Sequence, residues 1–284
     1  MKSAMLIIAH NNFEMLKLLI SKLDYKDNDI YVHIDKKCGD INFSQFESIT
    51  KYSKTICLRE RINVKWGGYS QIEVEMRLFD AAFNNKNGCK YDYFHLLSGV
   101  DFPLKSNEYI TQFLENNKGK EFIGFAKKSC QKIIKFRLGI YHFLSGRKWR
   151  RLDKYLLSPI QRMLGISRHR DYSNFTYGAN WVSITYALVD ALLKDKESIK
   201  NMYQFSFCCD EVFVQTYVYN HKEFLKNVYC FDDEFKSCMR LIDWTRGNPY
   251  TFQPIDVEKL QSSEALFARK FSPMCLDILR TLKV

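Results

Sequence analysis

The sequence predicts an α/β protein with an open, mostly parallel sheet that carries helices on both faces. Two observations support this expectation: short β-branched apolar runs alternate with apolar residues at helical spacing, and whole helices separate successive runs. Parallel strands need such crossover connections. Of the 284 residues 46% are hydrophobic, so the chain can bury a large core as one domain or two fused halves.

The first half of the chain contains strands and helices in alternation. The predicted strands are residues 5–9, 30–34, 55–58 and 93–97, and the predicted helices are residues 13–23 and 72–83. Ligands of open α/β sheets collect at the carboxyl ends of the strands. His10, Asp35 and residues 98–101 fall at those ends, which makes them candidates for a binding site.

The second half is built onto the first. Residues 181–183 are predicted as a strand that leads into a helix over 186–193. A further helix is predicted over 207–219, with Asp210 and Glu211 in its first turn, where the helix dipole favours carboxylates.

Residues 127–170 differ from the rest in charge. They hold 13 Lys and Arg against the single Asp153, and so they account for nearly all of the net charge of +11. An apolar stripe at helical spacing runs through Trp149, Leu152, Leu156 and Ile160. Three interpretations stay open: a solvated basic helix packed on the domain, interfacial contact with a membrane, and acceptor binding.

Nine cysteines are scattered without metal-ligand spacing and are interpreted as reduced thiols. The apolar run at the N-terminus is too short for a signal peptide or a membrane span, and no later window is long enough. We expect a cytoplasmic protein, with peripheral contact at the inner face of the membrane as an open alternative. Walker, GxGxxG, GxSxG and zinc motifs are absent from the sequence.

Acidic motifs give little support for a metal site. A metal-dependent sugar-nucleotide transferase needs an Asp-x-Asp after a core strand, to hold a divalent cation against a diphosphate. Residues 27–29 (DND) precede a strand and are interpreted as a polar turn, and the three acids of residues 232–234 (DDE) alternate faces if extended. We therefore expect no metal and no cofactor. Without a metal, cations such as Arg269 and Lys270 are the physical substitute.

Six segments in the same order resemble the core-2/I-branching β-1,6-N-acetylglucosaminyltransferases and the related peptide O-xylosyltransferases, which form glycosyltransferase family 14. The segments are IIAH (7–10), VHID (32–35), VKWGGYS (64–70), YDYFHLLSGVDFPL (91–104), DEVF (210–213) and LFARKF (266–271). The last segment, together with RLIDW (240–244), is closer to the xylosyltransferases and their bacterial relatives.

The resemblance implies one glycosyltransferase domain over residues 1–284. Its GT-A-like, Rossmann-type nucleotide-binding half would be residues 1–125, and residues 126–284 would be the acceptor-binding and catalytic half, with 127–170 as a basic insertion. It also implies inverting, metal-independent transfer from a UDP-sugar to a glycan or lipid-linked oligosaccharide in bacterial surface glycan synthesis. UDP-N-acetylglucosamine is the first choice of donor and UDP-xylose the alternative.

The resemblance also assigns the reacting groups. Glu211 matches the catalytic carboxylate, which as general base would take the acceptor hydroxyl proton. Lys270 matches the lysine that binds the diphosphate and stabilises the leaving group. A second cation is less clear in position: Arg246 is the nearest candidate, with Arg269 and Arg240 as alternatives.

Further residues are expected around the nucleotide. His10 and Asp35 would contact uridine and ribose at the ends of the first two strands. Trp66, Gly67 and Ser70 belong to a compact turn that either approaches the nucleotide or caps the next helix.

Three residues are expected at the acceptor. Asp101 is a candidate for sugar binding, although turn formation competes with that role, and Trp181 is assigned to the same site. Trp244 offers an aromatic face for sugar stacking or for plain core packing. A basic nucleic-acid-binding protein is the alternative of another class, but it gives no reason for Glu211 and Lys270 in their contexts, and we expect no nucleic-acid partner.

Overall fold

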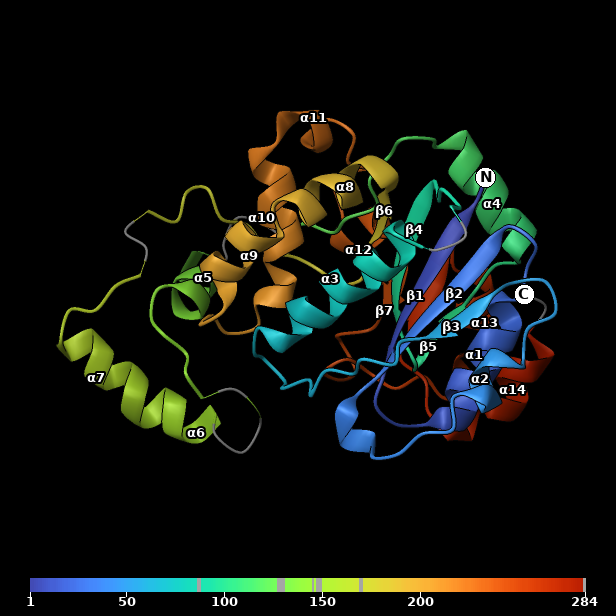
Figure 1. Ribbon diagram of the computed structural model, residues 1–284, viewed down its shortest axis with the longest axis horizontal. Helices are drawn as coiled ribbons and strands as arrows, with labels where there is room; N and C mark the ends of the chain where they lie inside the picture. The colour runs from blue at the N-terminus through green and yellow to red at the C-terminus, as the bar shows by residue number, and fades with distance from the viewer. Residues whose placement is uncertain (86–87, 127–130, 145, 147–149, 169–170, 283–284) are drawn as a thin grey trace.

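The computed structural model describes residues 1–284 except 86–87, 127–130, 145, 147–149, 169–170 and 283–284. Parts of the predicted basic insertion 127–170, including Trp149 of its apolar stripe, therefore lie outside the described residues. The described chain contains a five-stranded and a three-stranded sheet (Figure 1).

The large sheet confirms the predicted α/β class. Its strands, in spatial order, are β3 (Thr55–Cys57), β2 (Asn28–Ile34), β1 (Ser3–Ala9), β4 (Tyr93–Ser98) and β6 (Ser183–Thr185). The first four are parallel, and β6 pairs antiparallel with β4. The strand predicted over 181–183 is thus displaced toward 183–185, because Trp181 lies before the pairing with β4 begins.

Helices cover both faces of this sheet. Alternate residues of β1 point to opposite faces, so Met5 and Ile7 pack with α1 (Phe13–Leu23) while Ala4 and Leu6 join the cluster around α3 (Ser70–Phe83). The helix predicted over 13–23 is confirmed, and α3 begins two residues before the predicted 72. Two more helices lie on the same face as α1: α2 (Ser44–Glu47) and α4 (Asn107–Asn116). Three more lie on the same face as α3: α8 (Tyr186–Lys194), α9 (Lys196–Tyr203) and α10 (Phe213–Asn220).

The small sheet joins the end of the chain to its middle. β8 (Phe267–Arg269) lies between β5 (Asp101–Pro103), with which it is antiparallel, and β7 (Arg240–Ile242), with which it is parallel. Asp101 is therefore paired in register with Arg269. Near this sheet lie α12 (Glu234–Ser237), α13 (Val257–Ser262) and α14 (Leu276–Thr281), and α11 (Lys222–Leu225) follows α10.

The predicted helix over 207–219 is divided. Cys208 has a φ of 44°, and Cys209–Glu211 form a separate 3-10 turn before α10 begins at Phe213. Asp210 and Glu211 therefore precede the helix and are not in its first turn. Short 3-10 turns also occur at Lys36–Cys38, Pro254–Asp256 and Pro273–Cys275.

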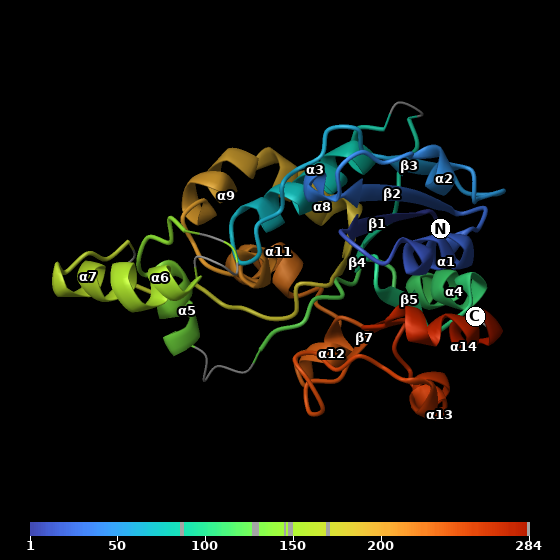
Figure 2. The ribbon, with the colours of Figure 1, turned by 90° about the horizontal axis from the view of Figure 1, so that it is seen from below.

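A helical segment extends away from the sheets. It comprises α5 (Gln131–Leu138), α6 (Arg150–Leu152), a π turn over Asp153–Leu157, and α7 (Ser158–Met163). Figures 1 and 2 show α6 and α7 at the end of the molecule opposite α13 and α14. Within the described ranges no helix combines the length and the apolar character that crossing a membrane requires.

Candidate active site

A small cavity marks the point where the strand order of the large sheet reverses. From β1 the chain proceeds to β2 and β3 on one side, while β4 lies on the other side of β1. Open α/β sheets bind ligands at such switch points, outside the carboxyl ends of the strands. The cavity is lined by Ile8, Ala9, His10, Asn11, Ser98, Gly99, Val100 and Arg269.

Arg269 enters this cavity from the small sheet. Its Nη1 lies 2.8 Å from Oδ1 of Asp101 and also donates to the Ser98 hydroxyl. Its guanidinium lies 4.2 Å from the centre of the Trp181 ring, a cation–π contact. The Asp101 carboxylate is buried and also accepts the Ser98 amide at 2.8 Å, so it positions Arg269. Sugar binding by Asp101 and Trp181 stays a prediction.

Lys270 differs from its neighbour because, over the described part of the chain, no carboxylate is ion-paired with its ammonium. The peptide bond between Arg269 and Lys270 is cis. The backbone around Lys270 is held on both sides: its carbonyl accepts the Phe252 amide, and the Phe271 amide donates to the Val100 carbonyl, both at 2.9 Å. Lys270 thus carries a positive charge that no described carboxylate pairs with, and it is the residue next to Arg269 in the chain.

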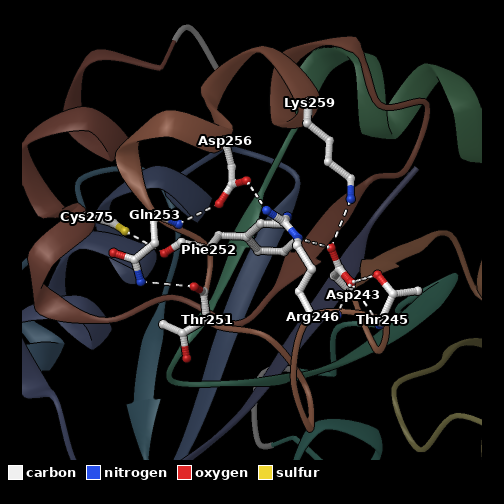
Figure 3. A network of polar contacts seen from close by, with 9 residues as sticks. All are labelled: Asp243, Thr245, Arg246, Thr251, Phe252, Gln253, Asp256, Lys259 and Cys275. Atoms are coloured by element: carbon white, nitrogen blue, oxygen red, sulfur yellow. Dashed lines mark hydrogen bonds and ion pairs between the residues drawn. The ribbon is translucent and has the colours of Figure 1, made fainter.

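Arg246 is engaged elsewhere (Figure 3). Its Nε lies 2.8 Å from Asp243 and its Nη1 2.7 Å from Asp256. Hydrogen bonds from Thr245, Arg246 and Lys259 hold the pKa of Asp243 well below its usual range. Two carboxylates already pair with Arg246, so the geometry gives no support to a contact between Arg246 and a diphosphate, which stays a prediction.

Trp244 lies beside this network. Its side chain is half exposed, and it follows Asp243 directly in the chain. The exposed ring is compatible with sugar stacking, and the alternative of full core packing for Trp244 is wrong.

Arg240 cannot serve as the second diphosphate cation. The residue is 2% exposed, and its guanidinium donates to the carbonyls of Cys238 and Val182, at 2.9 and 3.2 Å. Burial lowers its pKa to about 10. This alternative of the sequence analysis is wrong, because every guanidinium contact faces the core between the two sheets.

Asp35 and His10 lie at the ends of adjacent strands, as predicted. The Asp35 amide donates to the Ala9 carbonyl at 2.8 Å, which brings Asp35 next to exposed His10. The buried Asp35 carboxylate accepts the Lys37 amide at 2.9 Å and lies 3.2 Å from the Lys37 ammonium. Their contact with a nucleotide stays a prediction.

The turn that contains Trp66, Gly67 and Ser70 leads into α3 but, within the described residues, supplies no side-chain cap to that helix, and its approach to a nucleotide stays a prediction. The Ser70 hydroxyl accepts the Lys65 amide at 2.8 Å at the start of α3. Gly67 has a φ of 73°, and a Cβ there would lie 2.6 Å from the ring of Phe207. Its carbonyl accepts the Cys208 amide at 2.9 Å, so the turn packs against the segment that leads to Glu211.

Glu211 is held by a short ion pair with an arginine of α5. Its Oε2 lies 2.6 Å from Nη2 of Arg137 on α5, and about a third of the Glu211 side chain is exposed against 14% for Arg137. Arg137 also donates to the Cys208 carbonyl at 3.2 Å. Burial opposes the charge of Arg137, but Glu211 raises its pKa above the ordinary value. The pair holds Oε2, and among the described residues no hydrogen bond engages Oε1.

Asp210 is buried beneath Glu211. It accepts hydrogen bonds from Gln71 at 2.7 Å and from Asn180 at 3.2 Å. Burial, and then the charge of Glu211, raise its pKa to about 7. Asp210 therefore links α3 and the 3-10 turn to Asn180, the residue before Trp181.

Sequence reasoning missed the residues that hold Glu211 in place. Arg137 was counted only within the basic insertion, and Gln71 and Asn180 were not singled out. Gln71 directly follows the turn of residues 64–70 that the family resemblance had singled out, and this position could have marked it as a residue near the site. The partner of Arg137 could not be read from the sequence, because the two residues are 74 positions apart.

The acidic motifs have structural roles. Asp233 caps α12 by accepting the amides of Phe235 and Lys236, at 2.9 and 2.8 Å. Asn28 and Asp29 lie inside β2 and are buried, so the interpretation of residues 27–29 as a polar turn is wrong. Across the described ranges no cluster of three or more His, Cys, Asp or Glu is arranged to hold a metal ion.

The fold and these contacts define an α/β protein with a small cavity at the switch point of its large sheet, which Arg269 of the small sheet lines. Comparison with known families identifies the chain further. The Core-2/I-Branching enzyme family matches residues 4–264, and the chain belongs to this family of glycosyltransferases. The family resemblance found in the sequence is confirmed.

Several xylosyltransferases are similar to this chain. A xylosyltransferase of Ciona intestinalis is 23% identical over 94% of this chain, and xylosyltransferase 2 of Rattus norvegicus is 22% identical over 94%. The chain spans about a third of their length, 32% and 31%. The crystal structure of mouse xyloside xylosyltransferase 1 in its apo form is 11% identical, with 94% of this chain and 96% of that chain covered and a TM-score of 0.40.

Proposed function

We propose that this protein is an inverting glycosyltransferase that moves a sugar from a UDP-sugar to an acceptor hydroxyl. The observation that carries the proposal is the connection between Glu211 and Lys270. Asp210, the residue before Glu211, accepts a hydrogen bond from Asn180. Trp181 follows Asn180 in the chain, and its ring stacks on the guanidinium of Arg269. Lys270 follows Arg269. This chain of contacts supports the proposal that the base and the cationic site lie close together, and membership of the family supports their assignment.

The arrangement fits a single displacement. Glu211 takes the proton of the acceptor hydroxyl while that oxygen bonds to the anomeric carbon from the face opposite UDP. The bond from the anomeric carbon to the diphosphate oxygen breaks, and its electron pair leaves with UDP. Lys270 stabilises the growing charge on that oxygen, with Arg269 beside it, and no metal is required for this step.

His10 and Asp35 complete the proposed nucleotide site. Both lie at carboxyl ends of strands next to the cavity that Arg269 enters. A diphosphate between the cavity and Lys270 would place uridine toward these strand ends. The turn of Trp66, Gly67 and Ser70 would then border the reacting sugar through its contact with the segment before Glu211.

The donor sugar has two candidates. The sequence favours UDP-N-acetylglucosamine, and the names of the similar proteins favour UDP-xylose as the second candidate. The proposed acceptor is a glycan or lipid-linked oligosaccharide of bacterial surface glycan synthesis.

The direct test measures UDP release and sugar transfer in EDTA with UDP-N-acetylglucosamine, UDP-xylose and UDP-galactose. We expect one donor to react without added metal. Lys270→Ala should lower kcat by about 100-fold or more, because the leaving group loses a fixed charge. The matched control Lys196→Ala alters an exposed lysine of α9 and should leave kcat unchanged. An absolute requirement for a divalent metal, or full activity of Lys270→Ala, would contradict the proposal.

A further inference from the structure

The helical stretch 150–163, here named the outer helix, has the reverse of the usual burial pattern of a surface helix. Its residues that face the protein are polar: Asp153, Ser158 and Gln161 are all buried. Its large apolar side chains face away. Leu152, Tyr155, Leu156, Ile160 and Met163 are exposed, as is Leu164 directly after it. A helix that packs on its own domain by its apolar stripe shows the opposite pattern.

Polar contacts hold the outer helix in this orientation. His142 Nδ1 lies 2.6 Å from Asp153, and the Gln161 amide bonds the main chain of Tyr141 twice, each at 2.8 Å. The loop that carries His142 is in turn tied to the body, because the His142 amide donates to the Phe205 carbonyl at 2.7 Å. The apolar face is thus fixed outward by buried hydrogen bonds.

The charges around this face have one sign. Arg151, Lys154 and Arg162 are exposed, and the only acidic residue of 127–170, Asp153, is buried against His142. The surface therefore presents aliphatic side chains up to 81% exposed among cations that no acid of the same segment neutralises. Figure 2 shows α6 and α7 remote from the sheets, where a flat partner can approach them.

We propose that the outer helix is a docking surface for an anionic lipid bilayer. Cations at the headgroups with aliphatic and tyrosine side chains at the acyl boundary are the pattern of a helix that lies in the membrane interface. Nucleic acid would use the cations but gives no role to exposed Leu156, Met163 and Leu164. The outer helix does pack one face on the domain, as one interpretation had it, but that face is polar and the apolar face stays exposed. This proposal does not depend on the transferase activity.

Vesicle flotation tests the proposal directly. The full chain should float with phosphatidylcholine vesicles that contain about one third phosphatidylglycerol, and much less with phosphatidylcholine alone. Replacing Arg151, Lys154 and Arg162 by Gln should weaken binding to anionic vesicles about 100-fold, given roughly fivefold per charge. Met163→Ser with Leu164→Ser should weaken it by a similar factor, because apolar area no longer enters the interface.

Matched controls distinguish binding through the outer helix from non-specific binding through any exposed apolar side chain. Ile255→Ser with Met274→Ser removes two equally exposed apolar side chains elsewhere and should leave flotation unchanged. Equal binding by the wild type and both outer-helix variants would overturn the proposal. So would tighter binding to duplex DNA than to anionic vesicles, or a dimer in light scattering that Met163→Ser with Leu164→Ser converts to monomer.

Discussion

At the scale of single residues, Glu211 depends on a partner from a distant part of the chain. Motif context alone pointed to Glu211, but the arginine that fixes its Oε2 comes from α5, and the buried carboxylate beneath it is held by α3. The sequence could indicate Glu211 as the proposed base, because its neighbours along the chain carry the family signal. It could not indicate the supporting side chains, which only the tertiary fold brings together.

Arg137→Met should lower kcat about 10- to 100-fold, because Glu211 loses the contact that orients it toward an acceptor. Arg137→Lys should recover part of that loss. Steady-state kinetics at saturating donor measures both, and Lys135→Met, an exposed neighbour on α5, is the control. Unchanged kcat in Arg137→Met would show that the ion pair has no part in positioning Glu211.

Asp210 should make the free energy of unfolding depend on pH. Its pKa is raised to about 7 by burial and by Glu211, so the folded state binds the proton more tightly than the unfolded state. The resulting stabilisation is complete below the ordinary pKa of an aspartate and is lost as pH rises through about 7. Relative to Asp210→Asn, the wild type should therefore lose stability between about pH 4 and pH 7.

Urea denaturation at several pH values measures this difference. Buried His33 acts in the opposite direction, because burial lowers its pKa to about 4 and its contribution grows as pH rises. Since His33 is present in both proteins, its effect cancels in the comparison. A difference between wild type and Asp210→Asn that stays constant with pH would contradict the assigned state of Asp210.

At the scale of elements, regular spacing predicted most of the large sheet and its helices. The helix 13–23 was predicted correctly because its apolar residues recur at helical spacing on one face. The region around Asp210 was mispredicted as the first turn of a helix, because composition does not reveal that Cys208 adopts a positive φ. That backbone turn is enforced by its contacts with Gly67 and Arg137, which lie far away in sequence.

Gly67→Ala should destabilise the protein by about 1–3 kcal/mol, because its Cβ would collide with the Phe207 ring in addition to the strain of a positive φ. Gly165→Ala is a matched control: its φ of 67° is similar, it follows the end of α7, and nothing lies within 4 Å of the added Cβ. It should cost only about 1 kcal/mol. Thermal denaturation compares the two, and equal losses would show that the turn does not pack tightly against Phe207.

At the scale of the whole molecule, one buried cation connects the two sheets. Arg240 starts β7 of the small sheet, and its guanidinium donates to Val182 and to the Ser183 hydroxyl, at 3.2 and 3.0 Å, where β6 of the large sheet begins. The core that covers α3 also takes residues from both predicted halves of the chain. The sequence did not predict this junction, because an arginine in a short strand is more often exposed.

Arg240→Met should reduce the free energy of unfolding by about 2–4 kcal/mol, because it leaves buried oxygens without donors. Arg280→Met, an exposed arginine of α14, should change it by less than about 0.5 kcal/mol. Urea denaturation measures the change. If the dependence of the unfolding free energy on urea concentration (the m-value) is the same for variant and wild type, the variant has lost stability without a change in compactness. A neutral effect of Arg240→Met would show that the sheets are joined by apolar packing alone.

The central claim is that Glu211 is the base that removes the acceptor proton. The most direct measurement compares kcat and UDP affinity of Glu211→Gln with those of the wild type, by transfer assay and calorimetry in EDTA. We predict a fall in kcat of about 100-fold or more, with UDP affinity retained. Transfer by Glu211→Gln at the wild-type rate, with UDP bound equally well, would contradict the account.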